Sequence, residues 1–298
     1  MGIINDLLKD VPIPKMVRVR QNFHAPEITD VPKAVHESIE QANVLHRIFP
    51  GDRVAIAVGS RGVADIPIIT REVVNVVKQA GGIPFIVPAM GSHGGATAEG
   101  QKDVLIHLGV TEEFVGAPIC SSMEVVEVGR LDNGLPVYID KLAYEADKII
   151  VINRVKPHTA FRGPVESGLM KMITIGLGKQ KGADAAHKYS FKYMAQHVIE
   201  MAKIVINKAP IIFGVAVLEN AYDRPAKIVT VPTEHFETVE PELLIEAKAL
   251  MPKIMFNPID VLVIDEIGKD ISGDGMDPNI TGRYATPYAS GGPEVTRI

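Results

Sequence analysis

Two short segments of the chain are almost entirely apolar, Ala55-Ile-Ala-Val58 and Ile149-Ile-Val-Ile152. Strands of this composition are buried on both faces, which is typical of a parallel sheet covered by helices. Other β-branched runs alternate along the chain with longer segments of helical period. The pattern predicts an α/β fold, with a mostly parallel sheet flanked by helices.

The expected elements follow from the same two periodicities. Strands are expected at residues 16–19, 53–58, 83–87, 125–128, 136–139, 148–152, 211–218, 228–231 and 261–264. Helices are expected at residues 32–48, 66–79, 97–108, 168–175, 183–206 and 241–250. Thr97 is expected to cap the third of these helices.

The chain divides near residue 255, where a segment rich in proline ends the last helical pattern. Residues 1–255 are long enough for one complete α/β domain. Residues 256–298 begin with an apolar strand, but no helix follows that could cover it. We therefore expect 256–298 to be the beginning of a second α/β domain, either truncated or much reduced.

Composition excludes several classes of protein. Of 298 residues, 46% are hydrophobic, which is enough for a folded core. Lys and Arg total 31 against 36 Asp and Glu, and this weakly acidic balance argues against nucleic-acid binding. The single cysteine, Cys120, excludes a disulfide framework, and we expect neither a signal peptide nor a membrane-spanning run. A cytoplasmic enzyme is the expectation.

Three loops follow apolar strands, and ligands bind at the carboxyl ends of strands in α/β sheets. The first is Val58-Gly-Ser-Arg-Gly62, and the second is Pro88-Ala-Met-Gly-Ser-His-Gly-Gly95. The third begins with Asn153-Arg-Val-Lys-Pro-His158 and continues through Ser167-Gly-Leu-Met-Lys171 to His187. We expect these loops to form one site.

Each histidine in these loops has a functional and a structural interpretation. His93 lies among glycines just before a helix, so its backbone can approach a ligand, or it only forms a turn hydrogen bond. His158 lies near Arg154, Lys156 and Arg162, which predicts an anion site or a solvated basic face. His187 alone is interpreted more simply as a helix histidine than as a metal ligand. The segment Gly176-Leu-Gly-Lys179 lacks the spacing of a phosphate-binding loop.

Taken together, the loops resemble the nickel-pincer-nucleotide-dependent lactate racemase family, which includes 2-hydroxy acid racemases and epimerases. The resemblance covers about residues 50–190 and rests on these segments: Ser60-Arg61, Gly91-Ser-His93, Lys156-Pro-His158, Ser167-Gly-Leu-Met-Lys171 and His187. It identifies residues 1–255 with the N-terminal catalytic domain of that family.

The resemblance implies a cofactor and a role for each matching residue. The cofactor is the nickel-pincer nucleotide, pyridinium-3,5-bisthiocarboxylic acid mononucleotide nickel, made by cofactor-biosynthesis proteins. His187 matches the nickel ligand, Lys171 matches the lysine that can bind the cofactor covalently, and His93 and His158 match the two acid/base histidines. Further cofactor-binding residues are expected from the adjoining positions: Ser167, Arg61, Arg154 and Lys156.

A 2-hydroxy acid is therefore the expected substrate. The resemblance does not decide among lactate, larger hydroxy acids, dicarboxylates and sugar acids. His93 is followed by Gly94-Gly95 where lactate racemases usually carry Arg-Pro, and Leu169 replaces a glycine. Two alternatives remain from the residues alone. One is a non-catalytic nucleotide- or anion-binding module, and the other is a metal-dependent hydrolase or lyase with histidine ligands.

Overall fold

A computed structural model describes residues 2–12, 15–60, 62–268 and 271–298. Its central sheet has the strand order β2-β1-β5-β6-β7. All neighbours in this sheet run parallel except β6 and β7, which are antiparallel. The strands are β1 (Arg53–Val58), β2 (Ile83–Pro88), β5 (Lys148–Arg154), β6 (Ile211–Glu219) and β7 (Pro225–Pro232). The predicted α/β fold with a mostly parallel sheet is confirmed.

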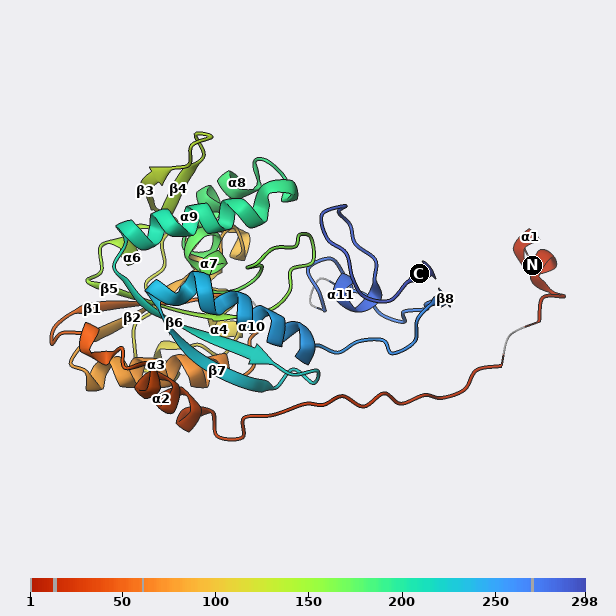
Figure 1. The fold of residues 1–298 in the computed structure, drawn as a ribbon, viewed down its shortest axis with the longest axis horizontal. Helices are drawn as coiled ribbons and strands as arrows, with labels where there is room; N and C mark the ends of the chain where they lie inside the picture. Colours follow the sequence, from red (N-terminus) through yellow and green to blue (C-terminus); the bar gives the residue numbers. More distant parts are fainter. Residues whose placement is uncertain (1, 13–14, 61, 269–270) are drawn as a thin grey trace.

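Helices cover both faces of this sheet, as Figure 1 shows. One face packs against α2 (Val31–Ala42) and α3 (Ile66–Gln79), and the other against α7 (Leu169–Lys171), α9 (Met194–Lys208) and α10 (Phe236–Leu250). In β1 the side chains alternate between the two layers, with Ala55 and Ala57 on the α9 side. Both faces are buried, which is why β1 and β5 read as continuous apolar runs.

The remaining elements lie at the margins of this core. A separate antiparallel hairpin consists of β3 (Val125–Arg130) and β4 (Pro136–Asp140). Near the C-terminus, β8 (Ile259–Val261) and β9 (Val295–Arg297) form a parallel pair. The shorter or peripheral helices are α1 (Ile3–Leu8), α4 (Ala98–His107), α5 (Glu112–Val115), α6 (Lys141–Tyr144), α8 (Lys179–His187) and α11 (Pro278–Thr281). The 3-10 turns are η1 (Leu45–Arg47), η2 (Gly94–Ala96), η4 (Phe191–Tyr193) and η5 (Thr233–His235).

Several sequence expectations about elements are wrong. The apolar strand expected at residues 261–264 is not formed there, because β8 ends at Val261 and both Val261 and Val263 are exposed. The helix expected over residues 183–206 is broken between α8 and α9, because Ser190 adopts a left-handed φ of 58°. This break leaves His187 at the end of α8. The strand expected at residues 16–19 is absent from that described stretch, which is irregular and runs away from the sheet (Figure 1). Residues 16–19 have no neighbouring strand to form hydrogen bonds with, so they do not form a strand, and Val17 and Val19 remain exposed.

Candidate functional site

Three loops at the carboxyl edge of the sheet pack against one segment of the chain. This segment contains α7 and the π-helix η3 (Met172–Gly176). Gly91 N donates to Gly176 O at 3.1 Å, and Asn153 Nδ2 donates to Gly168 O at 2.7 Å. A Cβ on Gly59 would lie 3.0 Å from the Met172 methyl group. The loops after β2, β5 and β1 therefore meet around the segment that carries Lys171, and single π-turns of this kind are frequent at functional sites.

His93 lies at the tip of the β2 loop with its side chain exposed. Its Nδ1 is hydrogen-bonded to Ser60 Oγ from the β1 loop. The loop turns sharply at Gly94, whose φ is +65° and whose added Cβ would lie 2.6 Å from Gly100 C. Thr97 caps α4 as predicted, because its side chain accepts from Gly100 N at 3.0 Å. The tight turn thus holds His93 against the neighbouring loop.

The loop that carries His158 is held by a buried carboxylate. Lys156 and Ser167 pair through their backbones and close the loop. Inside it, Glu166 is fully buried and accepts from His158 N at 2.7 Å. Lys248 Nζ from α10 lies 2.7 Å from the other Glu166 oxygen. Since a buried carboxylate needs such partners, Glu166 fixes the backbone at His158.

The imidazole of His158 is neutral, and its tautomer is defined by its neighbour. Burial lowers its pKa to about 2, with further lowering by the positive charges of Lys171 and Lys156. Its Nδ1 accepts from Ala160 N at 3.0 Å. Because a backbone N–H can only donate, the single ring proton is on Nε2. The Phe161 ring packs beside it, with centroids 4.4 Å apart.

Lys171 ends α7, and the start of this helix is fixed by Glu240 of α10. Glu240 is fully buried, and its Oε2 accepts from Met170 N at 2.9 Å. An added Cβ on Gly168 would overlap the same carboxyl group. The half-buried Lys171 side chain contributes its charge to the environment of His158, so the two lie in one site.

His187 is exposed at the end of α8, and one of its ring nitrogens is engaged by its own helix. Its Nδ1 lies 2.7 Å from Ala183 O, and a carbonyl can only accept, so Nδ1 carries the proton. Nε2 then keeps the lone pair that binds metals, and a metal-bound histidine commonly donates its other N–H in this way. The Phe191 ring packs against both histidines, with centroids 5.5 Å from His187 and 5.9 Å from His158.

Three other predicted binding residues lie around this cluster in different surroundings. Arg154 forms an ion pair with the nearly buried Glu219, which also accepts from Ala64 N at 2.7 Å. Lys156 Nζ lies 3.7 Å from Asp277 of the C-terminal segment. Ser167 is half-buried beside it. Arg61 lies outside the described residues.

Arg162, noted in the sequence as part of the basic cluster, joins the His158 loop to the C-terminal segment. Its guanidinium donates to His158 O at 2.6 Å and to Asn279 Oδ1 at 2.6 Å. It also donates to Tyr284 Oη at 2.7 Å and lies 3.2 Å from Glu166. These contacts occupy the guanidinium, so Arg162 orders the loop.

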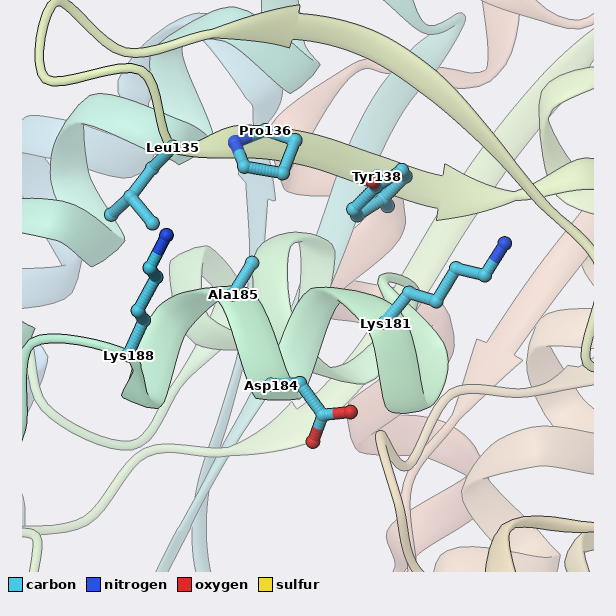
Figure 2. A pocket seen from close by; sticks show the side chains of 7 residues that line it. All are labelled: Leu135, Pro136, Tyr138, Lys181, Asp184, Ala185 and Lys188. Atoms are coloured by element: carbon cyan, nitrogen blue, oxygen red, sulfur yellow. The ribbon is translucent and has the colours of Figure 1, made fainter.

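Two hollows accompany the site. One, of about 470 Å³, is bordered by Pro157 and Arg162 of the His158 loop, the end of α10 and the C-terminal segment. The other, of about 310 Å³, lies between β4 and α8. Figure 2 shows that its charged side chains do not converge: Lys188 and Lys181 lie at opposite ends, and Asp184 points away from β4. The larger hollow borders the histidine site. In the smaller one, no set of the described polar side chains converges on a common point where a ligand could bind (Figure 2).

The described part of the chain contains no group of three or more His, Cys, Asp or Glu side chains that could hold a metal ion. The structure thus gives no support to a hydrolase in which His93, His158 and His187 ligate one metal. Over the same described residues, no helix combines the length and apolar character needed to cross a bilayer.

Several residues of the site carry no recognisable signal in the sequence. Phe161 and Phe191 resemble ordinary core aromatics, although they pack against His158. Glu166 and Glu240 resemble surface carboxylates, yet both are fully buried. The one signal that could have found Glu166 is its place inside a loop bounded by two motifs.

The lactate racemase N-terminal domain model matches residues 8–198, and the chain belongs to this family. The resemblance expected from the loops is therefore confirmed. A comparison with curated proteins finds no match.

Two solved structures share the fold. The lactate racemase apoprotein from Thermoanaerobacterium thermosaccharolyticum is 15% identical, with a TM-score of 0.56, over 80% of this chain and 60% of that one. A Thermotoga maritima protein from a structural genomics consortium is 14% identical, with a TM-score of 0.59, over 83% and 66%. This chain thus spans about two thirds or less of the length of either protein.

Proposed function

We propose that the protein is a racemase or epimerase of a 2-hydroxy acid that uses the nickel-pincer nucleotide. One observation carries this proposal: His158 and His187 both pack against Phe191, and the charge of Lys171 acts on His158, at the edge where the loops after β1, β2 and β5 meet. Membership of the lactate racemase N-terminal domain family supports the same reaction class.

The residues fit the cofactor. His187 would offer Nε2 to nickel, because Nδ1 is engaged with Ala183 O. An imidazole completing a set of soft sulfur donors suits nickel. Lys171 would hold the nucleotide, with Lys156 and Ser167 beside it and Arg61 from the β1 loop. Arg154 would not contact the cofactor directly, since it already forms an ion pair with Glu219. When bound, the nucleotide supplies a hydride acceptor and donor for carbon 2 of the substrate.

His93 is suited to both proton removal and proton donation. Its Nδ1 partner is the Ser60 hydroxyl, which can donate or accept. When Nδ1–H donates to Ser60, Nε2 is a base that can take the substrate hydroxyl proton. The imidazolium formed in this way can return the proton from Nε2–H, while Nδ1–H still donates to the Ser60 oxygen. Histidine serves this exchange because its ordinary pKa lies near neutral pH.

His158 begins from a different state. The Ala160 N–H can only donate to Nδ1, so the neutral ring presents Nε2–H as a hydrogen-bond donor. For Nε2 to act as a base, the ring must give up the Ala160 contact and carry its proton on Nδ1. We propose that His158 first binds the substrate oxygen as a donor and acts as the acid/base for the opposite enantiomer.

The test is racemisation by the reconstituted protein. We would load the 298-residue chain with the nickel-pincer nucleotide and incubate it with single enantiomers of lactate, larger hydroxy acids, dicarboxylates and sugar acids. Chiral chromatography should show the opposite enantiomer or epimer from at least one of them. If a fully loaded protein inverts none of these acids, the proposal is refuted.

Nickel retention tests the metal ligand separately. His187→Ala should lower bound nickel at least about tenfold after gel filtration, measured by inductively coupled plasma mass spectrometry. His107→Ala is the matched control, because exposed His107 also places Nδ1 2.7 Å from the carbonyl four residues earlier. Equal nickel in both variants would contradict the assignment of His187.

We also propose the domain division expected from the sequence, with residues 1–255 as the N-terminal domain and 256–298 as the beginning of a second α/β domain. The parallel β8–β9 pair, which lies outside the central sheet, supports this division.

A further inference from the structure

Lys179 is a fully buried lysine outside the group of residues assigned above. Its Nζ lies 2.5 Å from Pro88 O, 2.9 Å from Gln101 Oε1 and 3.2 Å from an Asp140 oxygen. Asp140 is also fully buried, and it balances the charge. The ammonium group donates hydrogen bonds to Pro88 O and Gln101 Oε1, and it forms an ion pair with Asp140. Lys179 therefore does not contribute a phosphate contact, despite following Gly176-Leu-Gly178.

These contacts determine the orientation of Gln101, which is fully buried on α4. Because an ammonium only donates, the amide of Gln101 must turn Oε1 toward Lys179. Its Nε2 then points the other way and donates to Gly91 O at 2.8 Å and His93 O at 3.2 Å. A flipped amide would place its NH₂ against the ammonium and its oxygen against two carbonyls.

Lys179 thus links two parts of the site. It begins α8, the helix that ends at His187, and it follows the η3 segment that begins after Lys171. Through Pro88 O it holds the end of β2, and through Gln101 it holds both sides of the His93 turn. Gly91 N adds a second link by donating to Gly176 O.

We propose that Lys179 is a positioning residue that orients Gln101 and thereby sets the place of His93 relative to the segment bearing Lys171 and His187. The importance of this placement rests on the acid/base role proposed for His93. A displacement of about 1 Å can slow an enzymatic step about 100-fold, so such a link bears on catalysis as well as on folding.

Two variants separate positioning from stability. Gln101→Met keeps the approximate side-chain volume and the Lys179–Asp140 pair, but it removes both donations to the His93 turn. The double variant Lys179→Met with Asp140→Asn removes both buried charges together, because a lone buried Asp140 would itself destabilise the fold. Lys181→Met is the control, since Lys181 is exposed on the same helix.

The first measurement needs no activity. In protein with ¹⁵N-labelled histidine, both variants should shift the His93 ring signals and its titration midpoint, with His158 and His187 signals unchanged. Nickel retained after loading should stay within about twofold of the parent, because the ligand His187 is untouched. Lys181→Met should leave every histidine signal in place. Unchanged His93 signals in Gln101→Met would overturn the proposal, even if the double variant fails to fold.

The second measurement uses the loaded enzyme. Gln101→Met should lower kcat about 10- to 100-fold and change KM less than about threefold, because the turn moves while the cofactor segment stays. Equal kcat in Gln101→Met and Lys181→Met would also contradict the proposal. If the parent protein racemises no hydroxy acid, the proposed function fails, and the histidine spectra still decide whether Lys179 positions His93.

Discussion

Glu240 shows how one residue can connect the packing of a helix to the site. Its carboxyl group is fully buried, accepts from the start of α7 and lies against Gly168. Burial raises its pKa from the ordinary 4.5 to about 7, although the amide hydrogen bonds from Met170 and Leu169 act in the opposite direction. Its Oε1 is buried and has no hydrogen-bond partner. The folded protein therefore binds a proton here that the unfolded chain releases.

This difference predicts a pH dependence of stability. Between about pH 4.5 and pH 7 the folded state keeps the Glu240 proton and the unfolded state loses it, so the free energy of unfolding falls as pH rises. The loss should approach about 3 kcal/mol and level off above pH 7. Glu240→Gln should lack this component, since an amide does not titrate.

Urea denaturation of both proteins at pH 5, 6, 7 and 8 measures the effect. The free energy of unfolding of the parent minus that of Glu240→Gln should decrease from pH 5 to pH 7 and level off toward pH 8. A constant difference would show that Glu240 titrates at the same pH in the folded and unfolded chain.

At the scale of elements, the His93 loop and α4 form one tightly packed unit. Gly94 adopts a left-handed φ, and an added Cβ on Gly100 would overlap Gly94 O. Gly100 lies within α4, where alanine ordinarily favours the helix by about 1 kcal/mol. Packing against the turn opposes this preference.

Gly100→Ala should therefore destabilise the protein by about 1–3 kcal/mol, the usual cost of overpacking. It should also displace the His93 ring signals, since the turn must move to make room for the new methyl group. Gly62→Ala is the control, because its Cβ would meet nothing within 4 Å and its φ is not in the left-handed region. A Gly100→Ala protein as stable as the control, with unchanged His93 signals, would contradict this packing argument.

The elements also show what sequence could predict. The bounds of β1 and α3 match their periodic patterns, and the Thr97 cap is a local interaction between neighbouring residues. The break before Phe191 was missed, because it depends on a left-handed Ser190 within an otherwise helical pattern. The order of motifs predicted which loops meet. The roles of Glu166, Gln101 and Lys179 could not be predicted, since none has a motif of its own and each also depends on a partner that is distant in sequence: Lys248 for Glu166, Lys179 for Gln101 and Pro88 for Lys179.

At the scale of the whole molecule, Arg162 joins the C-terminal segment to the α/β core. Figure 1 shows this segment beside the body of the protein, connected through the chain that follows α10. Arg162 donates to Ser290 O at 3.1 Å as well as to Asn279 and Tyr284, and its ring contact with Tyr284 measures 5.1 Å. The same guanidinium supports the carbonyl of His158. Docking of the C-terminal segment and the shape of the His158 loop are thus coupled through one side chain.

Arg162→Met should release this segment and loosen the loop together. Loss of the guanidinium leaves buried Glu166 with Lys248 as its remaining cation, which should lower the free energy of unfolding by about 3 kcal/mol. Limited proteolysis followed by mass spectrometry should show earlier cleavage within residues 271–298. Arg130→Met is the control, because Arg130 is exposed and pairs with Glu127 on the β3–β4 hairpin. Cleavage at the same rate in both variants would mean that contacts other than those of Arg162 hold the C-terminal segment. Arg162 would then not couple the docking of this segment to the shape of the His158 loop.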